Sequence, residues 1–279
     1  MNFPIRTGGH LLRQFALTLR ILRADCVSAL MTVLVRTVHM TRPLAPATLA
    51  LREDLSLALR AASMHGLSEG VCNHFSVEVG KDRFLINPRG LHWSEVQASD
   101  IVLVDGWGEV LEGAHEVEPS ALFIHAAVHR IAGHAVVLHT HMPYASSLTL
   151  TEAGALDPML SQNALRFFDR IAVDREYNGL ALAPAEGERI ARAMAGKDVA
   201  FLGNHGVIVA GARLSFAYDD LYYLERAAQQ QLLAASSGSP LRPITSTDLA
   251  RHTAAQIQGE RLQSDLFFEA LRRLLPPKH

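Results

Sequence analysis

Three histidines of this chain have the residue type and spacing of a divalent-metal site. His139 and His141 lie two residues apart at the end of the apolar run Ala135–Leu138, which predicts a buried strand. Because alternate residues of a strand point to the same face, the two imidazoles should lie side by side. His205 occupies a glycine-flanked turn, Gly203–Gly206, which can aim a third imidazole inward. Three neutral imidazoles leave coordination positions open for a substrate, which is typical of a catalytic metal.

The remaining candidates allow more than one interpretation. A histidine pair spaced two apart also occurs in protein cores, bonded to backbone carbonyls, and the glycine turn is what favours metal here. His125 and His129 are four residues apart on a predicted helix, so they share a face, and we interpret them as structural neighbours of the ligands. His74 and Tyr144 are the nearest candidates for proton transfer by sequence, although such residues are more often structural.

The elements that must position these residues predict one α/β domain. Helices are indicated by amphipathic spacing with proline near the start or glycine at the end, and strands by β-branched runs between turn residues. The expected order is a helix over 46–66, an antiparallel meander over 74–110, a helix over 119–133, strand 135–141, helix 184–196, strands 199–202 and 207–210, helix 214–235, a hinge at 236–240 and a C-terminal helix ending near Leu275. This order predicts a central sheet with helices on its faces.

We divide the chain into a basic N-terminal extension (1–43), a metal-binding domain (44–236) and a C-terminal hinge and helix (237–279). The extension sets six arginines against the single acid Asp25. It is either a targeting segment or a stretch upstream of a true start at Met40, and its apolar run Val27–Val35 is too short to span a bilayer.

Composition narrows the classes of partner. With 279 residues, of which 49% are hydrophobic, the chain can bury a full core. A net charge of −2 with scattered basic residues argues against nucleic acid. Cys26 and Cys72 are far apart and form no CxxC pair, which favours a reducing, cytoplasmic compartment. We therefore expect a small-molecule substrate, with neither nucleic acid nor membrane as a partner.

At this point a series of motifs becomes recognisable, and from about Leu51 to Ala235 the chain resembles the class II aldolase/adducin family. The motifs, in chain order, are Cys72–Ser76, Asn87–Gly90, Asp105–Gly108, Val137–His141, Phe201–Gly206 and the helix end Leu224–Glu225. The resemblance implies an α/β/α sandwich around a largely antiparallel sheet, and a homotetramer with its sites between subunits. It also implies that His139, His141 and His205 bind zinc, with manganese, cobalt or iron(II) as alternatives.

The same resemblance places substrate binding at Asn73, Arg89 and Ser120, and one departure from the family bears on the substrate. The sugar-phosphate enzymes carry a glutamate near the start of the helix before the paired histidines, and nothing ionisable replaces it in Ser120–Ile124. Glu118 precedes the helix, but its direction cannot be read from sequence. Arg89 lies in a loop that binds phosphate in those enzymes, and it could instead pair with a carboxylate or be a solvated loop residue.

These features favour a metal-dependent carbon–carbon lyase, of aldolase or decarboxylase type, acting on a small hydroxy-carbonyl or carboxylate substrate. Decarboxylation survives loss of the glutamate better than retro-aldol cleavage, which needs a base to remove a hydroxyl proton. Two alternatives stay open. Three histidines can also hold iron(II) in an oxygenase of an aromatic or hydroxy acid. The chain could also be a non-catalytic, adducin-like scaffold.

Overall fold

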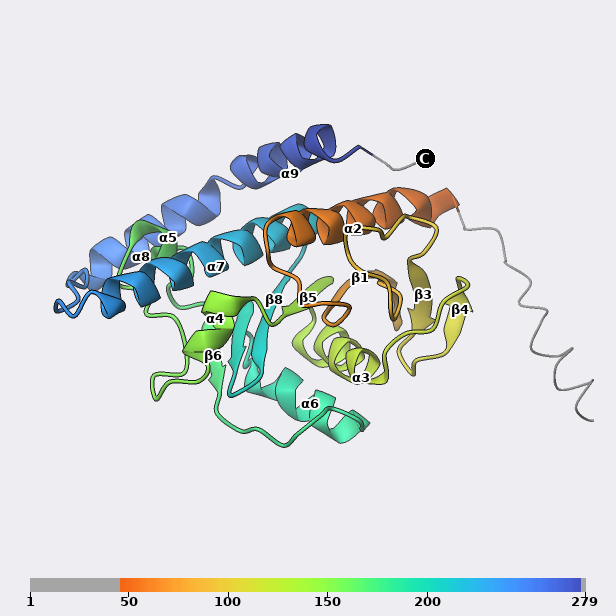
Figure 1. Ribbon diagram of the computed structural model, residues 1–279, viewed down its shortest axis with the longest axis horizontal. Helices are drawn as coiled ribbons and strands as arrows, with labels where there is room; N and C mark the ends of the chain where they lie inside the picture. Colours follow the sequence, from red (N-terminus) through yellow and green to blue (C-terminus); the bar gives the residue numbers. More distant parts are fainter. Residues whose placement is uncertain (1–45, 277–279) are drawn as a thin grey trace, which may run out of the picture. The chain divides into compact units, whose positions relative to one another are not determined.

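The computed structural model describes residues 46–276 as a single sheet covered by helices on both faces (Figure 1). The predicted extension 1–43 lies outside the described residues. The eight strands are β1 (His74–Gly80), β2 (Arg83–Ile86), β3 (Val102–Asp105), β4 (Val110–Glu112), β5 (Val136–Thr140), β6 (Ile171–Asp174), β7 (Val199–Leu202) and β8 (Gly206–Gly211). The helices are α2 (Pro46–Met64), α3 (Pro119–Ala127), α4 (Pro143–Leu148), α5 (Gln162–Leu165), α6 (Pro184–Ala193), α7 (Leu214–Ser236), α8 (Thr247–Gly259) and α9 (Leu262–Leu274).

The sheet has the order β4-β3-β2-β1-β5-β8-β7-β6, and only the pairing of β6 with β7 is parallel. The largely antiparallel sheet of the predicted fold class is therefore confirmed. Strand β5 lies at the centre between β1 and β8, where its apolar run is buried along its whole length. A strand covered on both faces needs apolar residues at consecutive positions, as the sequence provides here.

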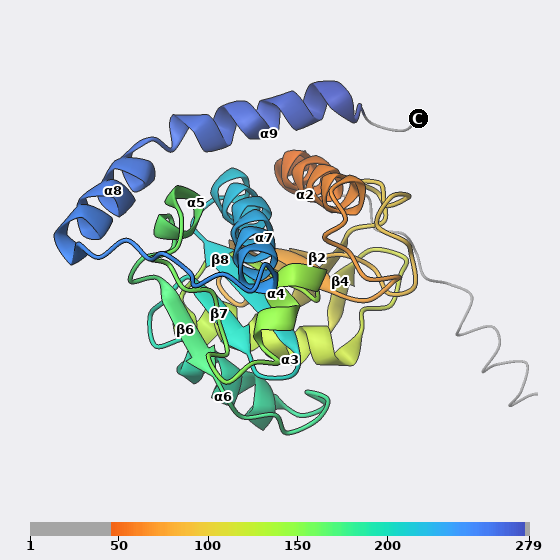
Figure 2. The same ribbon diagram turned by 60° about the vertical axis from the view of Figure 1, so that its left-hand side comes forward.

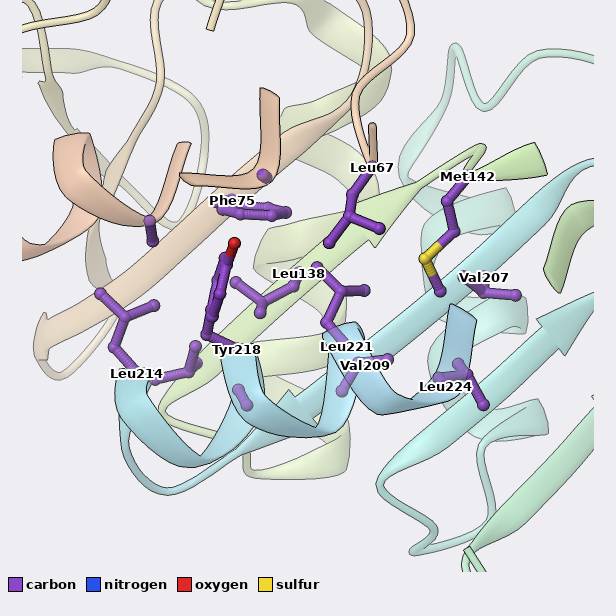
Figure 3. Close-up of a cluster of buried hydrophobic side chains, with 14 of the residues drawn as sticks. Leu67, Phe75, Leu138, Met142, Val207, Val209, Leu214, Tyr218, Leu221 and Leu224 are labelled. Atoms are coloured by element: carbon purple, nitrogen blue, oxygen red, sulfur yellow. The ribbon is translucent and has the colours of Figure 1, made fainter. Parts of the chain in front are cut away.

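Helices α2 and α7 cover one face of the sheet, with α9 packed on their outer side, and α3 and α6 cover the other face (Figure 2). Even-numbered residues of β5 point to the first face, where Leu138 packs with Phe75, Val209, Tyr218 and Leu221 (Figure 3). Odd-numbered residues point to the second face, where Val137 packs among side chains of α3 and α6. The alternation of a strand thus carries His139 to the face that α3 covers.

The helix before β5 differs from the uniform helix that the sequence predicts. α3 begins at Pro119, with Glu118 as its N-cap, and continues after Ala127 into a π-helical turn over Val128–Ala132. Gly133, at φ 74°, ends the turn, in agreement with the predicted glycine stop. π-Helical turns widen the helix locally, and this one carries His129.

The prediction of a single C-terminal helix was wrong. Residues 247–274 form two helices, α8 and α9, because the backbone leaves helical geometry at Glu260, with φ −92° and ψ 37°. α9 packs on the core through Phe268 and Leu271. Arg261, between the two helices, forms an ion pair of 2.9 Å with the buried Asp220 of α7. Within residues 46–276, none of the helices combines the length and apolar character needed to span a bilayer.

Candidate metal centre

The three predicted ligands come together at one end of the central strands. His139 is on β5, His141 follows the end of β5, and His205 is in the turn between β7 and β8. The antiparallel register pairs Thr140 with Val207, so the turn between β7 and β8 lies beside the end of β5. One ligand atom from each histidine lies within 4.8 Å of the others, and the ring centroids are 4.8–5.0 Å apart. Residues 64 positions apart therefore form one compact cluster.

Hydrogen bonds fix which nitrogen of two of these rings is free. Nδ1 of His139 lies 3.0 Å from the carbonyl of Val207, and a carbonyl can only accept, so Nδ1 carries the proton. Nδ1 of His141 lies 2.6 Å from the Glu69 carboxylate, which favours the same tautomer. A proton on Nδ1 leaves Nε2 of the neutral His139 ring as a bare lone pair, and Nε2 of His141 is buried without a hydrogen-bond partner among residues 46–276. This is the arrangement that metal-binding histidines show, so the residues fit a divalent cation.

Burial keeps His139 and His205 neutral near pH 7. Desolvation, reinforced by the neighbouring histidines, holds the pKa of His139 well below its ordinary value of 6.5. Desolvation and the nearby His141 lower the pKa of His205 to about 4. Because a metal binds the neutral form of imidazole, the protein does not have to release protons from these two rings near pH 7.

The turn needs glycine at position 206 because the backbone there lies close to Thr140 and His141. A Cβ added at Gly206 would lie 2.6 Å from Cδ2 of His141 and 2.7 Å from the Thr140 carbonyl oxygen. Asn204, at φ 55°, takes the left-handed conformation that asparagine tolerates better than most residues. Only glycine at position 206 therefore allows the start of β8 to lie this close to Thr140 and His141.

The three histidines line a cavity of about 400 Å³. Most of the predicted site residues line the same cavity, namely Asn73, His74, Arg89 and Ser120 with the three ligands. Tyr144 does not line it; this residue lies in the first turn of α4, where its backbone N–H donates to the Glu225 carboxylate at 2.9 Å. The structure thus brings together all the predicted site residues except Tyr144.

Asn73 and Arg89 differ in how firmly the structure holds them. Asn73, at φ 75°, is buried, and its Oδ1 accepts a hydrogen bond from the His141 backbone at 3.2 Å. Its Nδ2 is buried without a partner among the described residues. The Arg89 guanidinium is exposed at the cavity and forms no hydrogen bond or ion pair with residues 46–276. Arg89 therefore brings an uncompensated positive charge to the cavity.

Glu118 places a carboxylate at the cavity wall. The sequence alone did not show in which direction this side chain points. Glu118 caps α3 by accepting from the Ala121 backbone at 3.2 Å, and it also accepts from the Ser120 hydroxyl. Its Oε2 lies 3.9 Å from Nε2 of His74. The signal in the sequence was the Glu-Pro pair, since an acidic N-cap before a first-turn proline turns its side chain back over the helix start.

His74 and His125 complete the wall beside Glu118. Their rings meet edge to face with centroids 6.0 Å apart, and both are buried. Burial lowers the pKa of His74 to about 4, against the opposing effect of Glu118. Cys72, the first residue of the motif Cys72–Ser76, and Tyr177 also line the cavity, and Tyr177 did not stand out in the sequence because it belongs to no pattern that predicts a site. Taken together, the wall presents the three clustered histidines, the Arg89 cation, the Glu118 carboxylate and the imidazoles of His74 and His125.

Comparison with known proteins identifies the family of the chain. The model of the family described as Class II Aldolase and Adducin N-terminal domain matches residues 53–232. A Pseudomonas aeruginosa protein named as a class 2 aldolase is 32% identical over 203 residues, which cover 71% of this chain and 77% of that protein. The crystal structure of an aldolase II superfamily protein from Pseudomonas syringae has a TM-score of 0.75 and 28% identity, covering 84% of this chain and 94% of that one.

Two relatives have names that state an activity. The decarboxylase NovR of Streptomyces niveus is 33% identical over 183 residues, covering 65% of this chain and 66% of that protein. A Streptomyces roseochromogenus protein named 4-hydroxy-3-prenylphenylpyruvate oxygenase/4-hydroxy-3-prenylbenzoate synthase is also 33% identical over 183 residues, with 65% of each chain covered.

Proposed function

The chain belongs to the class II aldolase and adducin family, and from this premise we propose that it is a divalent-metal-dependent carbon–carbon lyase of decarboxylase or aldolase type. The substrate we propose is a small hydroxy-carbonyl or carboxylate compound. The observation that carries the proposal is the convergence of His139, His141 and His205 on the cavity that Arg89 also lines. A scaffold without chemistry has no need to bring three imidazoles together around one point.

We propose zinc as the metal, with manganese, cobalt or iron(II) as alternatives, because a set of three imidazoles with open positions is common in catalytic zinc sites. A divalent cation held by these residues would act as a Lewis acid that stabilises negative charge developing on substrate oxygens.

The protein's own groups would bind and orient the substrate. Arg89 is free to form a bidentate pair with a carboxylate, which would fix one end of the substrate against the cavity wall. In a decarboxylation, the bond to the carboxylate carbon breaks, carbon dioxide leaves, and the electron pair stays on the neighbouring carbon, which then takes up a proton. Glu118 and His74 are the groups at the wall that could deliver this proton. The relative named as a decarboxylase supports this choice over sugar aldolysis.

A second candidate is an iron(II) oxygenase of an aromatic or hydroxy acid, which the relative named as an oxygenase favours. The ligand set alone does not separate the two, since three imidazoles also suit iron(II). The third candidate, an adducin-like scaffold, has in its favour that nothing ionisable replaces the family glutamate in Ser120–Ile124. Against it stand the three clustered histidines and the Glu118 carboxylate at the cavity wall.

We also propose a homotetramer and a cytoplasmic location. Tyr177 and Leu180 at the cavity, with the neighbouring Leu182, are 56%, 74% and 62% exposed. Large apolar side chains grouped at a site are the kind of surface that another subunit covers. The two widely separated cysteines suit a reducing compartment.

The experiment that tests the function is elemental analysis of protein purified without added metal or chelator, with oxygen uptake and carbon dioxide release recorded against hydroxy acids and aromatic acids. Zinc, manganese or cobalt near one per chain, with product formed and no oxygen consumed, is the result expected for a lyase. Iron with substrate-dependent uptake would favour the oxygenase. His139→Ala should bind no stoichiometric metal, and a variant that keeps its full metal content would overturn the assignment of the site.

A further inference from the structure

A chain of hydrogen bonds runs behind the metal cluster and ends at the cavity. Ser76 of β1 lies between two histidines of the helix that covers it. Its Oγ is 2.6 Å from Nδ1 of His125 and 2.7 Å from Nε2 of His129. Nδ1 of His129 is 2.7 Å from the backbone carbonyl of His134. All three side chains are buried, so water does not compete for these contacts.

The donor and acceptor of each hydrogen bond in this chain follow from its last group, the His134 carbonyl. The His134 carbonyl can only accept, so Nδ1 of His129 carries a proton. Burial lowers the pKa of His129 to about 4, so the ring is neutral near pH 7 and its Nε2 must be an acceptor. The Ser76 hydroxyl therefore donates to His129 and accepts from Nδ1 of His125. His125 is neutral as well, since burial holds its pKa well below the ordinary value.

The consequence is a fixed, unprotonated nitrogen on a residue that lines the cavity. Nε2 of His125 carries no proton, it is buried, and it has no hydrogen-bond partner among residues 46–276. His125 lines the same cavity as the three metal ligands. Nδ1 of the adjacent His74 is also buried without a partner, so this part of the wall has two nitrogens that protein groups do not satisfy. An unsatisfied acceptor in an apolar wall costs free energy unless a bound ligand supplies a donor.

We propose that His125 determines specificity for a hydroxylated substrate, its Nε2 accepting a hydrogen bond from a substrate hydroxyl. This inference rests on the proposed function for the presence of a substrate in the cavity, and it names one group that the substrate must carry. A wall built to accept from a hydroxyl discriminates against an analogue that lacks it, because binding the analogue leaves the buried nitrogen unpaired. Ser76 and His129 act as positioning residues, since they only set the tautomer of His125.

The first test is independent of substrate and metal. Protein labelled with nitrogen-15 histidine is examined by long-range proton–nitrogen correlation NMR, without metal and after loading with zinc, and the His125 signals are assigned by their loss in His125→Phe. The expected result is a protonated Nδ1 and an unprotonated Nε2. A protonated Nε2 would overturn the proposal whatever the enzyme's reaction proves to be.

The second test measures binding to zinc-loaded protein by calorimetry with matched pairs, namely lactate and propionate, 3-hydroxybutyrate and butyrate, and 4-hydroxybenzoate and benzoate. We expect the wild type to prefer the hydroxylated member of at least one pair, and His125→Phe to reduce that preference about tenfold at unchanged zinc content. His65→Phe is the matched control, because His65 bonds to Tyr218 on the other face of the sheet and should leave the preference unchanged.

Ser76→Ala provides a variant that keeps the ring. It removes the acceptor of Nδ1 and frees the tautomer, so we expect a smaller loss of preference and a mixed tautomer in the NMR spectrum. This variant decides the matter if His125→Phe does not fold. A wild type without preference in any pair, or a preference that survives in both variants, would refute the role of His125. Failure to bind zinc would instead count against the proposed function and leave the tautomer result standing.

Discussion

Replacing Gly206 by alanine should disable the metal centre through a displacement whose size the structure gives. The added Cβ would lie 2.6 Å from Cδ2 of His141 and 2.7 Å from the Thr140 carbonyl oxygen, where ordinary van der Waals contact begins at 3.4 Å. One or both groups must therefore move by about 0.8 Å. Metal–ligand distances tolerate deviations of only about 0.2 Å, so a ligand displaced this far is lost to the metal or held in poor geometry.

We expect Gly206→Ala to weaken zinc binding at least about 100-fold and to destabilise the metal-free protein by about 1–3 kcal/mol. Zinc affinity is measured by competition with a chromophoric chelator, and stability by urea unfolding of the metal-free protein. Gly259→Ala is the matched control, since a Cβ there meets no atom within 4 Å, and it should leave both quantities unchanged or raise stability slightly. Wild-type zinc affinity in Gly206→Ala would refute the argument from close approach.

Four further predictions test the neighbouring groups. Glu69→Gln should weaken zinc binding about 10-fold in the same competition assay, because it removes the charge that orients His141, and unchanged affinity would contradict that role. Glu118→Gln should lower kcat at least about 100-fold at full metal content, and full activity would exclude Glu118 from proton transfer. Arg89→Ala should raise the KM of a carboxylate substrate; an unchanged KM would sink the carboxylate hypothesis. The metal-free protein should lose stability in urea unfolding as the pH falls from 6.5 toward 4, because the unfolded chain binds more protons than the folded one over that range, and a flat profile would contradict the lowered pKa values of His74, His129 and His205.

The order of the elements and the ligand set could be read from local patterns. An apolar run ending in two histidines specifies a buried strand with both imidazoles on one face, because a strand alternates with a period of two. Glycines on both sides of His205 indicate a tight turn, because the requirement for glycine comes from the local backbone conformation. Motif order then identified the family and, through it, the largely antiparallel sheet.

What surrounds the ligands was decided by the tertiary structure. Glu69 reaches His141 across 72 residues, and no periodicity links the two positions. Tyr144 follows closely after the ligand pair in sequence, yet it lies in the first turn of a new helix, outside the cavity lining. His125 lies on α3, and which of its nitrogens is protonated depends on Ser76 of β1 and on the His134 carbonyl, which follows the π-helical turn. Backbone periodicity fixes which face a side chain takes, whereas hydrogen-bond partners depend on which elements pack together, and packing brings distant residues into contact.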